Sequence, residues 1–284
     1  MFAHVDTRKT PEVEAQVHSI YQGMFPGGDA AFVARAFEWA GDCFNGRFAG
    51  YQAIDARYHD FEHTLQGTLC LARLLHGWHA AGAKPKVTPH GFELALLAIL
   101  FHDSGYLKKR GDSEGTGAKY TVTHVARSAD FAREFLATKG FAAGDLDAVR
   151  NMIHCTDVNA DLQAIPFRDE LERTLGCSLG TADLLGQMAA PDYVEKLPVL
   201  YLEFAEAVRH GGSNAGRSGT YKSAEELARN TPSFWENYVL PKIKNDFGSL
   251  HVFLNDPYPD GPNPYLQAIQ RNLSRIEETE KRQP

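Results

Sequence analysis

Apolar residues recur at intervals of three and four positions along most of this chain, which is the spacing of one face of an α-helix. This pattern predicts helices over residues 29–44, 60–80, 89–103, 120–139, 145–155, 166–175, 179–189 and 191–209. Alternation with a period of two, which is typical of a half-buried strand, is scarce. Residues 251–254 leave room for one short strand, but a single strand makes no sheet. The pattern therefore predicts an all-α protein.

Short motifs mark where some of these helices begin and where loops interrupt them. In a Thr-Pro pair the hydroxyl caps the first N–H groups of a helix, and proline suits the first helical position. We expect a helix start at each of three such pairs: Thr10-Pro11, Thr88-Pro89 and Thr231-Pro232. We expect loops at 108–118, 211–219 and 255–264, which are rich in glycine or proline. The C-terminal residues 275–284 are expected to form a fraying helix end.

Length and charge limit the classes of protein to which the chain can belong. With 284 residues, one helical domain spanning 1–284 is the simplest expectation. The net charge of −7 argues against nucleic acid or an anionic membrane as the main partner. Lys108, Lys109 and Arg110 form either a local cationic patch or, as we expect, a solvated loop.

The compartment follows from what the sequence lacks. The N-terminus has no apolar signal-peptide core, and the longest apolar run, Leu94 to Phe101, is too short to cross a bilayer. We expect a soluble cytoplasmic protein. The four cysteines form no CxxC pair and are expected to be reduced core thiols.

The strongest local signal for chemistry is the pair His102-Asp103, which ends the apolar stretch 92–101. Two ionisable side chains at the inner end of a buried helix need a partner or a metal ion, because an isolated buried charge is costly. A His-Asp hydrogen bond that caps the helix is the simpler alternative. The remaining candidate ligands favour metal.

Further metal-type side chains follow at the spacing of successive helices: His63, His124, His154 and Asp183. A histidine on a helix is more often structural when it stands alone, whereas Asp183, between Ala182 and Leu184, needs a partner. Imidazole and carboxylate ligands together suit zinc, iron or manganese. His59 lies four positions before His63 and shares its helix face, so one of the two could bind a metal ion while the other faces the substrate beside it. Taken alone, a pair of partly exposed helix histidines is the more common case. The segment starting at Asp157 imitates a calcium loop, but its sixth position is leucine and its twelfth is arginine, so we reject that interpretation.

This order of residues resembles the HD superfamily of metal-dependent phosphohydrolases, whose pattern is H…HD…D on a helical bundle. The resemblance covers roughly residues 55–190, and residues 191–284 would form a C-terminal helical extension. Tyr58-His59-Asp60-x-x-His63 is similar to the Y-H-N-x-x-H signature of cyclic nucleotide phosphodiesterases, in which the first histidine is the proton donor and the second a ligand.

The chain also departs from this family's subgroups. Asp60 replaces the signature asparagine, and Tyr106 stands where the cyclic nucleotide enzymes have histidine and HD-GYP proteins have lysine. No GYP triplet follows His154, and the acidic pair of alarmone hydrolases is absent. Gln187, one turn after Asp183, is a candidate to face the pocket.

The resemblance implies a binuclear phosphodiesterase that acts on a small-molecule phosphate ester, such as a nucleotide, with two divalent ions (Zn, Fe, Mn or Mg). The implied ligands are His63, His102 and Asp183 for one ion, His124 and His154 for the other, with Asp103 bridging. A hydroxide between the ions would attack phosphorus, and His59 would protonate the leaving oxygen.

Three alternatives remain open from the sequence. Some HD proteins bind two irons through the same ligand order and activate dioxygen, although Tyr106 replaces the lysine of the inositol-oxidising type. A mononuclear nucleotide phosphohydrolase, in which His124 and His154 are structural, is the second. A metal-bound ligand sensor is the third, and the sequence contains no recognisable DNA-binding module in its favour.

Overall fold

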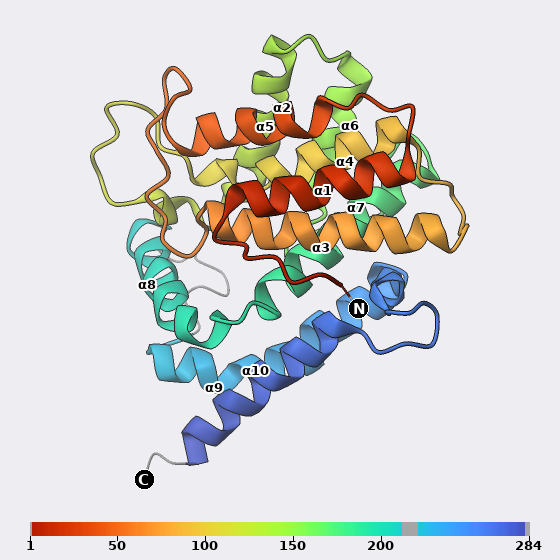
Figure 1. The fold of residues 1–284 in the computed structure, drawn as a ribbon. Coiled ribbons are helices and arrows are strands. Elements are labelled where there is room, and N and C mark those ends of the chain that lie inside the picture. Colours follow the sequence, from red (N-terminus) through yellow and green to blue (C-terminus); the bar gives the residue numbers. More distant parts are fainter. Residues whose placement is uncertain (1, 212–220, 282–284) are drawn as a thin grey trace.

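The computed structural model describes residues 2–211 and 221–281, and in these ranges the protein is all-α (Figure 1). The α-helices of the described residues are α1 (Thr10–Met24), α2 (Phe32–Phe44), α3 (Phe61–Ala80), α4 (Pro89–Phe101), α5 (His124–Thr138), α6 (Ala143–His154), α7 (Glu170–Met188), α8 (Tyr193–Gly211), α9 (Ala224–Phe234) and α10 (Pro264–Lys281). Short 3₁₀ turns lie at Ser104–Tyr106, Gly117–Tyr120 and Leu250–Leu254. The prediction of an all-α protein is confirmed. Of the loop expected at 211–219, the described part is Gly211, which ends α8.

The short strand considered at residues 251–254 does not form. The segment is instead the 3₁₀ turn Leu250–Leu254, in which the N–H of Val252 donates to the carbonyl of Ser249 over 3.1 Å. A strand needs a neighbour to satisfy its backbone groups, and within the described residues the one β-bridge, Tyr51 with Lys109, lies elsewhere. Without such a neighbour, local hydrogen bonds take over.

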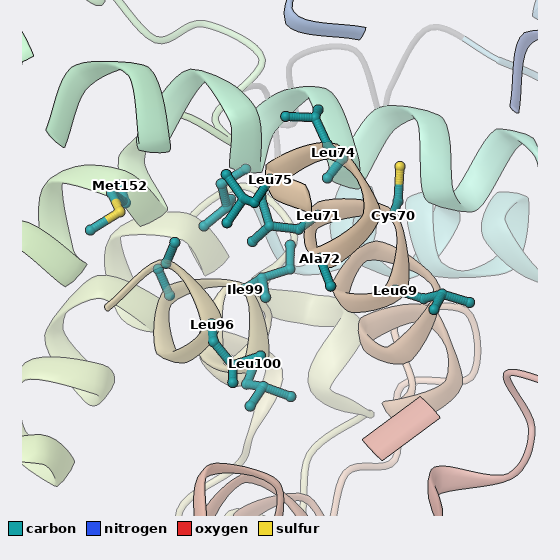
Figure 2. Packing of buried hydrophobic residues seen from close by; sticks show 14 of the residues in the cluster. Leu69, Cys70, Leu71, Ala72, Leu74, Leu75, Leu96, Ile99, Leu100 and Met152 are labelled. Atoms are coloured by element: carbon teal, nitrogen blue, oxygen red, sulfur yellow. The ribbon is translucent and has the colours of Figure 1, made fainter. Parts of the chain in front are cut away.

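Helix α4 lies at the centre of the core. Every residue from Leu94 to Phe101 is buried, so the helix is apolar on all sides. Such a helix must be surrounded by other elements, and α4 packs against α2, α3, α6 and α7. Figure 2 shows Leu71 and Leu75 of α3, Ile99 of α4 and Met152 of α6 in this packing. The far end of α4 is consequently inside the protein, which is where His102 and Asp103 follow.

Two of the three Thr-Pro pairs stand at a helix start. The hydroxyl of Thr88 accepts a hydrogen bond from the N–H of Gly91 over 3.0 Å and caps α4, as predicted. Helix α1 begins at Thr10, as predicted, but Thr10 is its first helical residue rather than its cap, because Lys9 occupies the N-cap position.

The prediction of a helix start was wrong at Thr231, which lies inside α9 and donates its hydroxyl to the carbonyl of Leu227. Pro232 removes one helical N–H, but α9 continues directly into the wider π-helical turns at Trp235–Val239 and Lys242–Asp246.

The two helices predicted at 166–175 and 179–189 are one helix, α7. Gly180, within this helix, serves close packing. A Cβ at Gly180 would lie 2.8 Å from the carbonyl oxygen of Cys155 and 2.7 Å from the ring of Phe247. Neighbouring segments therefore approach α7 closely there, and the apolar contacts outweigh the weak helix preference of glycine.

The loop at 108–118 is largely exposed, as expected for Lys109 and Arg110, but it is anchored at both ends. Lys108 is the exception to the expected solvated loop, because it is buried and forms an ion pair with Asp55 at 2.8 Å. Further along, the hydroxyl of Thr116 donates to Glu206 of α8 over 2.8 Å, and the N–H of Gly117 donates to Asp55 over 2.7 Å. This loop therefore links α8 to the body of the protein.

Helices α8, α9 and α10 lie along one side of the body in Figure 1, where α9 and α10 run beside each other. They join the body at the end of α7, because the side-chain amide of Asn272 donates to the carbonyls of Met188 and Ala190 over 2.9 and 2.8 Å. No helix among the described residues combines the length and the apolar character that a membrane crossing requires. The cysteines are buried free thiols, as predicted.

Candidate functional site

Four predicted ligands from three helical segments meet inside the protein. His63 lies one turn into α3, His102 and Asp103 directly follow α4, and Asp183 lies in the middle of α7. The Nε2 atom of His63 is 3.2 Å from Asp103 Oδ2 and 3.3 Å from Asp183 Oδ1. The Nε2 atom of His102 is 3.2 Å and 3.4 Å from the same two oxygens. We call these residues the four-residue group.

The backbone explains why these side chains point at one another. Asp60 caps α3 by accepting the N–H of His63 over 2.9 Å, which orients the first turn of that helix. The Nδ1 atom of His102 lies 2.7 Å from the carbonyl of Ile99, which can only accept, so Nδ1 carries the proton. The lone pair of His102 Nε2 consequently faces the two carboxylates.

The two carboxylates of the four-residue group need positive charge beside them. His102 Nε2 and Asp103 Oδ2 are buried and have no hydrogen-bond partner. Burial alone would lower the pKa of His63, but Asp103 and Asp183 outweigh it and raise that pKa to about 9. Burial would likewise raise the pKa of Asp103, yet the charge of the neighbouring His102 imidazole, together with His63, holds it well below its usual value. Protons on the imidazoles, or one cation in their place, meet this need.

The dimensions of the four-residue group suit a cation. The ligand atoms of His63, His102 and Asp103 lie within 4.8 Å of one another, so these three residues form a possible metal site. Neighbouring ligands of one zinc-sized ion are about 3.4 Å apart. The four His–Asp contacts of the group, 3.2 to 3.4 Å, are close to this distance, with Asp183 beside the three residues of the possible metal site. Two nitrogen and two oxygen donors suit zinc, iron or manganese, and the bond to Ile99 holds His102 in the ligating tautomer.

His124 lies beside the group at a greater distance. Its Nε2 atom is 3.8 Å from Asp103 Oδ1, and its Nδ1 atom is 2.6 Å from the carbonyl of Thr121. Burial lowers its pKa against the opposing effect of Asp103. The start of α5 can approach this closely because residue 105 is glycine: a Cβ there would be 2.0 Å from the carbonyl oxygen of His124.

Tyr106 packs against two of the candidate histidines. Its ring stacks on His59 with centroids 4.5 Å apart and an interplanar angle of 13°, and on His124 at 4.7 Å and 25°. The centroids of His59 and His124 are 6.0 Å apart, so the three rings form one aromatic cluster. Burial raises the pKa of Tyr106 well above the usual value.

The structure adds one residue that the sequence analysis missed, Glu203 of α8. One of its oxygens accepts the N–H groups of Arg57 and Tyr58, each over 2.7 Å, and the other lies 2.6 Å from His59 Nδ1. Burial would raise the pKa of Glu203, but His59 and these N–H groups together lower it, so it is a carboxylate. Because Glu203 takes Nδ1, Nε2 is the nitrogen that His59 presents to the cavity it lines. The sequence did contain a signal that Glu203 is buried. It lies three residues after Leu200 and four before Ala207, on an apolar face of the helix.

The structure does not bring His154 to the group. His154 is half-buried at the end of α6 and lines a cavity of about 290 Å³ with Arg150 and Asp157, which adjoins the cavity over the group at Asp157 but contains none of its four residues. The adjacent Cys155 faces the core, and neighbouring helical positions point about 100° apart, so His154 is turned away from it. Five of the six predicted ligands are therefore close to one another: four form the four-residue group, and His124 lies beside it. His154 lies outside this set.

A cavity of about 280 Å³ opens over the group. Its polar floor contains His59, Tyr106, His124 and Asp183, and its walls come largely from α8 and α9. Gln187 lines it too, as predicted: its side-chain oxygen accepts the hydroxyl of Tyr58 over 2.9 Å. This bond directs the amide nitrogen of Gln187 toward Asp183 Oδ1, 3.4 Å away.

Comparison with known proteins gives one match. A family model described as Npun_R2479-like matches residues 15–256, a range that includes the four-residue group, His59 and Glu203. No curated protein matches the chain.

Proposed function

The chain belongs to the Npun_R2479-like family, and we propose that it is a metal-dependent phosphodiester hydrolase with an HD-type helical core. The observation that carries the proposal is a shared cavity. The paired His59 and Glu203 line or adjoin the same space as Asp183 of the four-residue group, so a proton donor stands next to a candidate metal centre. The order His63, His102-Asp103, Asp183 supports the resemblance to HD phosphohydrolases.

In this proposal His63, His102, Asp103 and Asp183 hold one divalent cation. The bound ion would lower the pKa of water and offset the charge of the phosphoryl oxygens. The geometry favours one ion over two, because His154, the expected ligand of a second, lines a different cavity. We therefore propose hydrolysis at a single metal ion, in place of the two ions expected from the sequence.

The chain's own groups move the proton. In hydrolysis the oxygen of water bonds to phosphorus and the P–O bond of the ester breaks. His59, as an imidazolium, gives its Nε2 proton to the leaving oxygen, and the proton lost by water restores it. Glu203 stabilises the imidazolium through the 2.6 Å contact with Nδ1, and the stack with Tyr106 sets the plane of the ring.

Elemental analysis combined with a rate assay tests this function. The purified protein is expected to contain about one zinc, iron or manganese per chain and to hydrolyse bis(4-nitrophenyl) phosphate. Removal of the ion by a chelator should abolish turnover, and its return should restore it. Turnover that survives complete removal of metal, or oxygen consumption by an iron-loaded protein that hydrolyses no ester, contradicts the proposal.

Two variants decide the number of ions. Asp183→Asn should lose the ion, because an amide is a poor ligand in place of a buried carboxylate. His154→Ala should keep both the ion and the activity. Two ions per chain in the wild type, with one lost in His154→Ala, would restore the binuclear centre.

A further inference from the structure

The cavity over the four-residue group has no cationic side chain among the described residues that line it. Its charged lining residues are Asp157 and Asp183, with His59 and His124 beside them. Sites for polyphosphates rely on arginine and lysine to bind the additional negative charges. No described residue of these walls performs that role.

The charge of the centre points the same way. Asp103 and Asp183 carry two negative charges within the four-residue group, and a divalent cation between them brings the sum to zero. A neutral centre binds a monoanion through the metal but offers no excess positive charge for a polyanion. A phosphodiester, which carries one negative charge, fits this balance.

The walls that α8 and α9 contribute to the cavity are mostly apolar, while Thr121, Thr156, Asn159 and Gln187 add polar groups elsewhere in its lining. These apolar walls consist chiefly of Leu197, Leu200 and Phe204 of α8, with Leu227 and Phe234 of α9. Leucine and phenylalanine offer no hydrogen bonds to the edges of a base or a sugar. Their contribution is burial of an apolar group, which is favourable in proportion to the area removed from water.

The rim of the cavity shows the same character. Val122 is 47% exposed and Val158 is 42% exposed, and both line the cavity. Large apolar side chains left in water beside a pocket are typical of a site that a ligand covers. The exposed valines, the walls from α8 and α9 and the lack of cationic side chains among the described lining residues all favour a ligand with an apolar group and little negative charge.

We infer that the substrate is a phosphate ester with one negative charge and an uncharged, largely apolar organic group that fills the pocket between α8 and α9. The inference rests on the proposed function and adds the substrate class to it. The cavity of about 280 Å³ is near the lower end of ligand pockets, so the apolar group is compact, on the scale of an aromatic ring. Nucleoside polyphosphates are expected to be poorer substrates, because no cationic side chain is among the described residues that line the cavity.

A pair of non-hydrolysable anions tests the pocket without relying on turnover. Methyl(phenyl)phosphinate and dimethylphosphinate each carry one charge and differ by a phenyl group. Calorimetric titration of the metal-bound protein should show methyl(phenyl)phosphinate binding about 10- to 100-fold more tightly, the gain expected from burying one aromatic ring. Equal affinities would overturn the inference.

Matched variants on α8 locate the effect. Leu200→Asn places a polar side chain of similar size on the wall and should remove most of the preference for the phenyl ligand. Leu202→Asn, on the same helix at a position 60% exposed, should retain it. Equal loss in both variants, or none in Leu200→Asn with metal content and helicity unchanged, would count against this pocket.

Kinetics separate this inference from the proposed function. Methyl 4-nitrophenyl phosphate and phenyl 4-nitrophenyl phosphate share a leaving group and a charge, and the phenyl ester should have a kcat/KM about 10- to 100-fold higher. If both esters are hydrolysed at the same kcat/KM, the pocket assignment fails and the hydrolase stands. If neither ester is hydrolysed while the phenyl phosphinate is still preferred, the hydrolase fails and the apolar pocket stands. Faster hydrolysis of a nucleoside triphosphate than of the phenyl ester overturns the substrate class.

Discussion

The ends of α4 and α6 carry the same residue type in different surroundings. His102 follows an apolar helix and is 2% exposed, with two carboxylates against its Nε2 atom. His154 ends a helix that buries one face, and its nearest charged neighbours include Arg150 and Asp157. The carboxylates raise the pKa of His102 well above its usual value despite burial, whereas burial and Arg150 lower that of His154.

The comparison teaches when a histidine at a helix end is a candidate ligand. α4 is surrounded on all sides, so its end lies where α3 and α7 bring further ligands. α6 buries one face, so its end reaches a cavity at the edge of the core. The burial of the whole helix, rather than the histidine itself, separates the two cases.

Removing Asp103 should have the largest effect on this comparison. Asp103→Ala takes away the carboxylate that contacts both His63 and His102, so metal content and diester hydrolysis should fall to the background of the metal-free protein. The counterpart, His154→Ala, should change turnover less than about twofold and stability by less than about 1 kcal/mol. Elemental analysis, rate assays and thermal unfolding of both variants measure this. Metal retained in Asp103→Ala would place the ion elsewhere.

His59→Ala should retain the metal but slow the reaction by about 10²–10⁴-fold. The loss should depend on the leaving group: large for an alkyl leaving group, and small for 4-nitrophenolate, which leaves as a stable anion. Glu203→Gln should show the same dependence with a smaller loss, because the imidazolium loses its negative partner but keeps a hydrogen bond. A loss that is equal for both leaving groups would mean that His59 is structural.

The pH dependence of the metal-free protein should distinguish the two helix ends by thermal unfolding. His63 has a folded pKa of about 9 against 6.5 when unfolded. The stability that its protonation contributes is therefore complete below about pH 6.5 and is lost as the pH rises through 9. The acids of the group have lowered pKa values, so their contribution does not change in this range.

We expect the Tm of the metal-free protein to fall by about 5–10 °C between pH 6.5 and pH 9. The Tm of the metal-bound protein should not fall over this pH range, because the cation replaces the protons on the imidazoles and binds more tightly as the pH rises. Metal-free His154→Ala should follow the metal-free wild type, since the pKa of His154 is lowered and lies outside this range. A metal-free protein that is equally stable at both pH values would argue against buried imidazoles that share carboxylates.

The smallest expected difference concerns how the two helices begin. Thr88 caps α4, whereas Ala142 stands at the N-cap of α6 with no side-chain bond. Thr88→Ala should lower the free energy of unfolding by about 1 kcal/mol. Ala142→Ser should raise it by about 0.5–1 kcal/mol, because the backbone there already has the extended conformation of a cap (φ −68°, ψ 152°). Chemical denaturation measures both, and no gain in Ala142→Ser would show that the start of α6 is satisfied in another way.

Local pattern was sufficient for much of this protein. Apolar spacing predicted the all-α class and located most helices, because the period of a helix is written in consecutive residues. The same logic marked His102-Asp103, since a run of apolar residues that ends in two ionisable groups is visible in the sequence. It misplaced details that depend on neighbours: the start at Thr231, the break within α7 and the strand at 251–254.

What the tertiary structure alone decided is which distant groups face one another. Glu203 lies 144 positions after His59 and yet contacts it, and no local period reports such a pairing. His154 has the residue type and spacing of a ligand, but the packing of α6 turns it toward another cavity. The apolar pocket likewise exists because α8 and α9 fold back over the group. Period and composition describe each helix by itself, whereas a site is set by the packing between helices, which the sequence of any one of them does not contain.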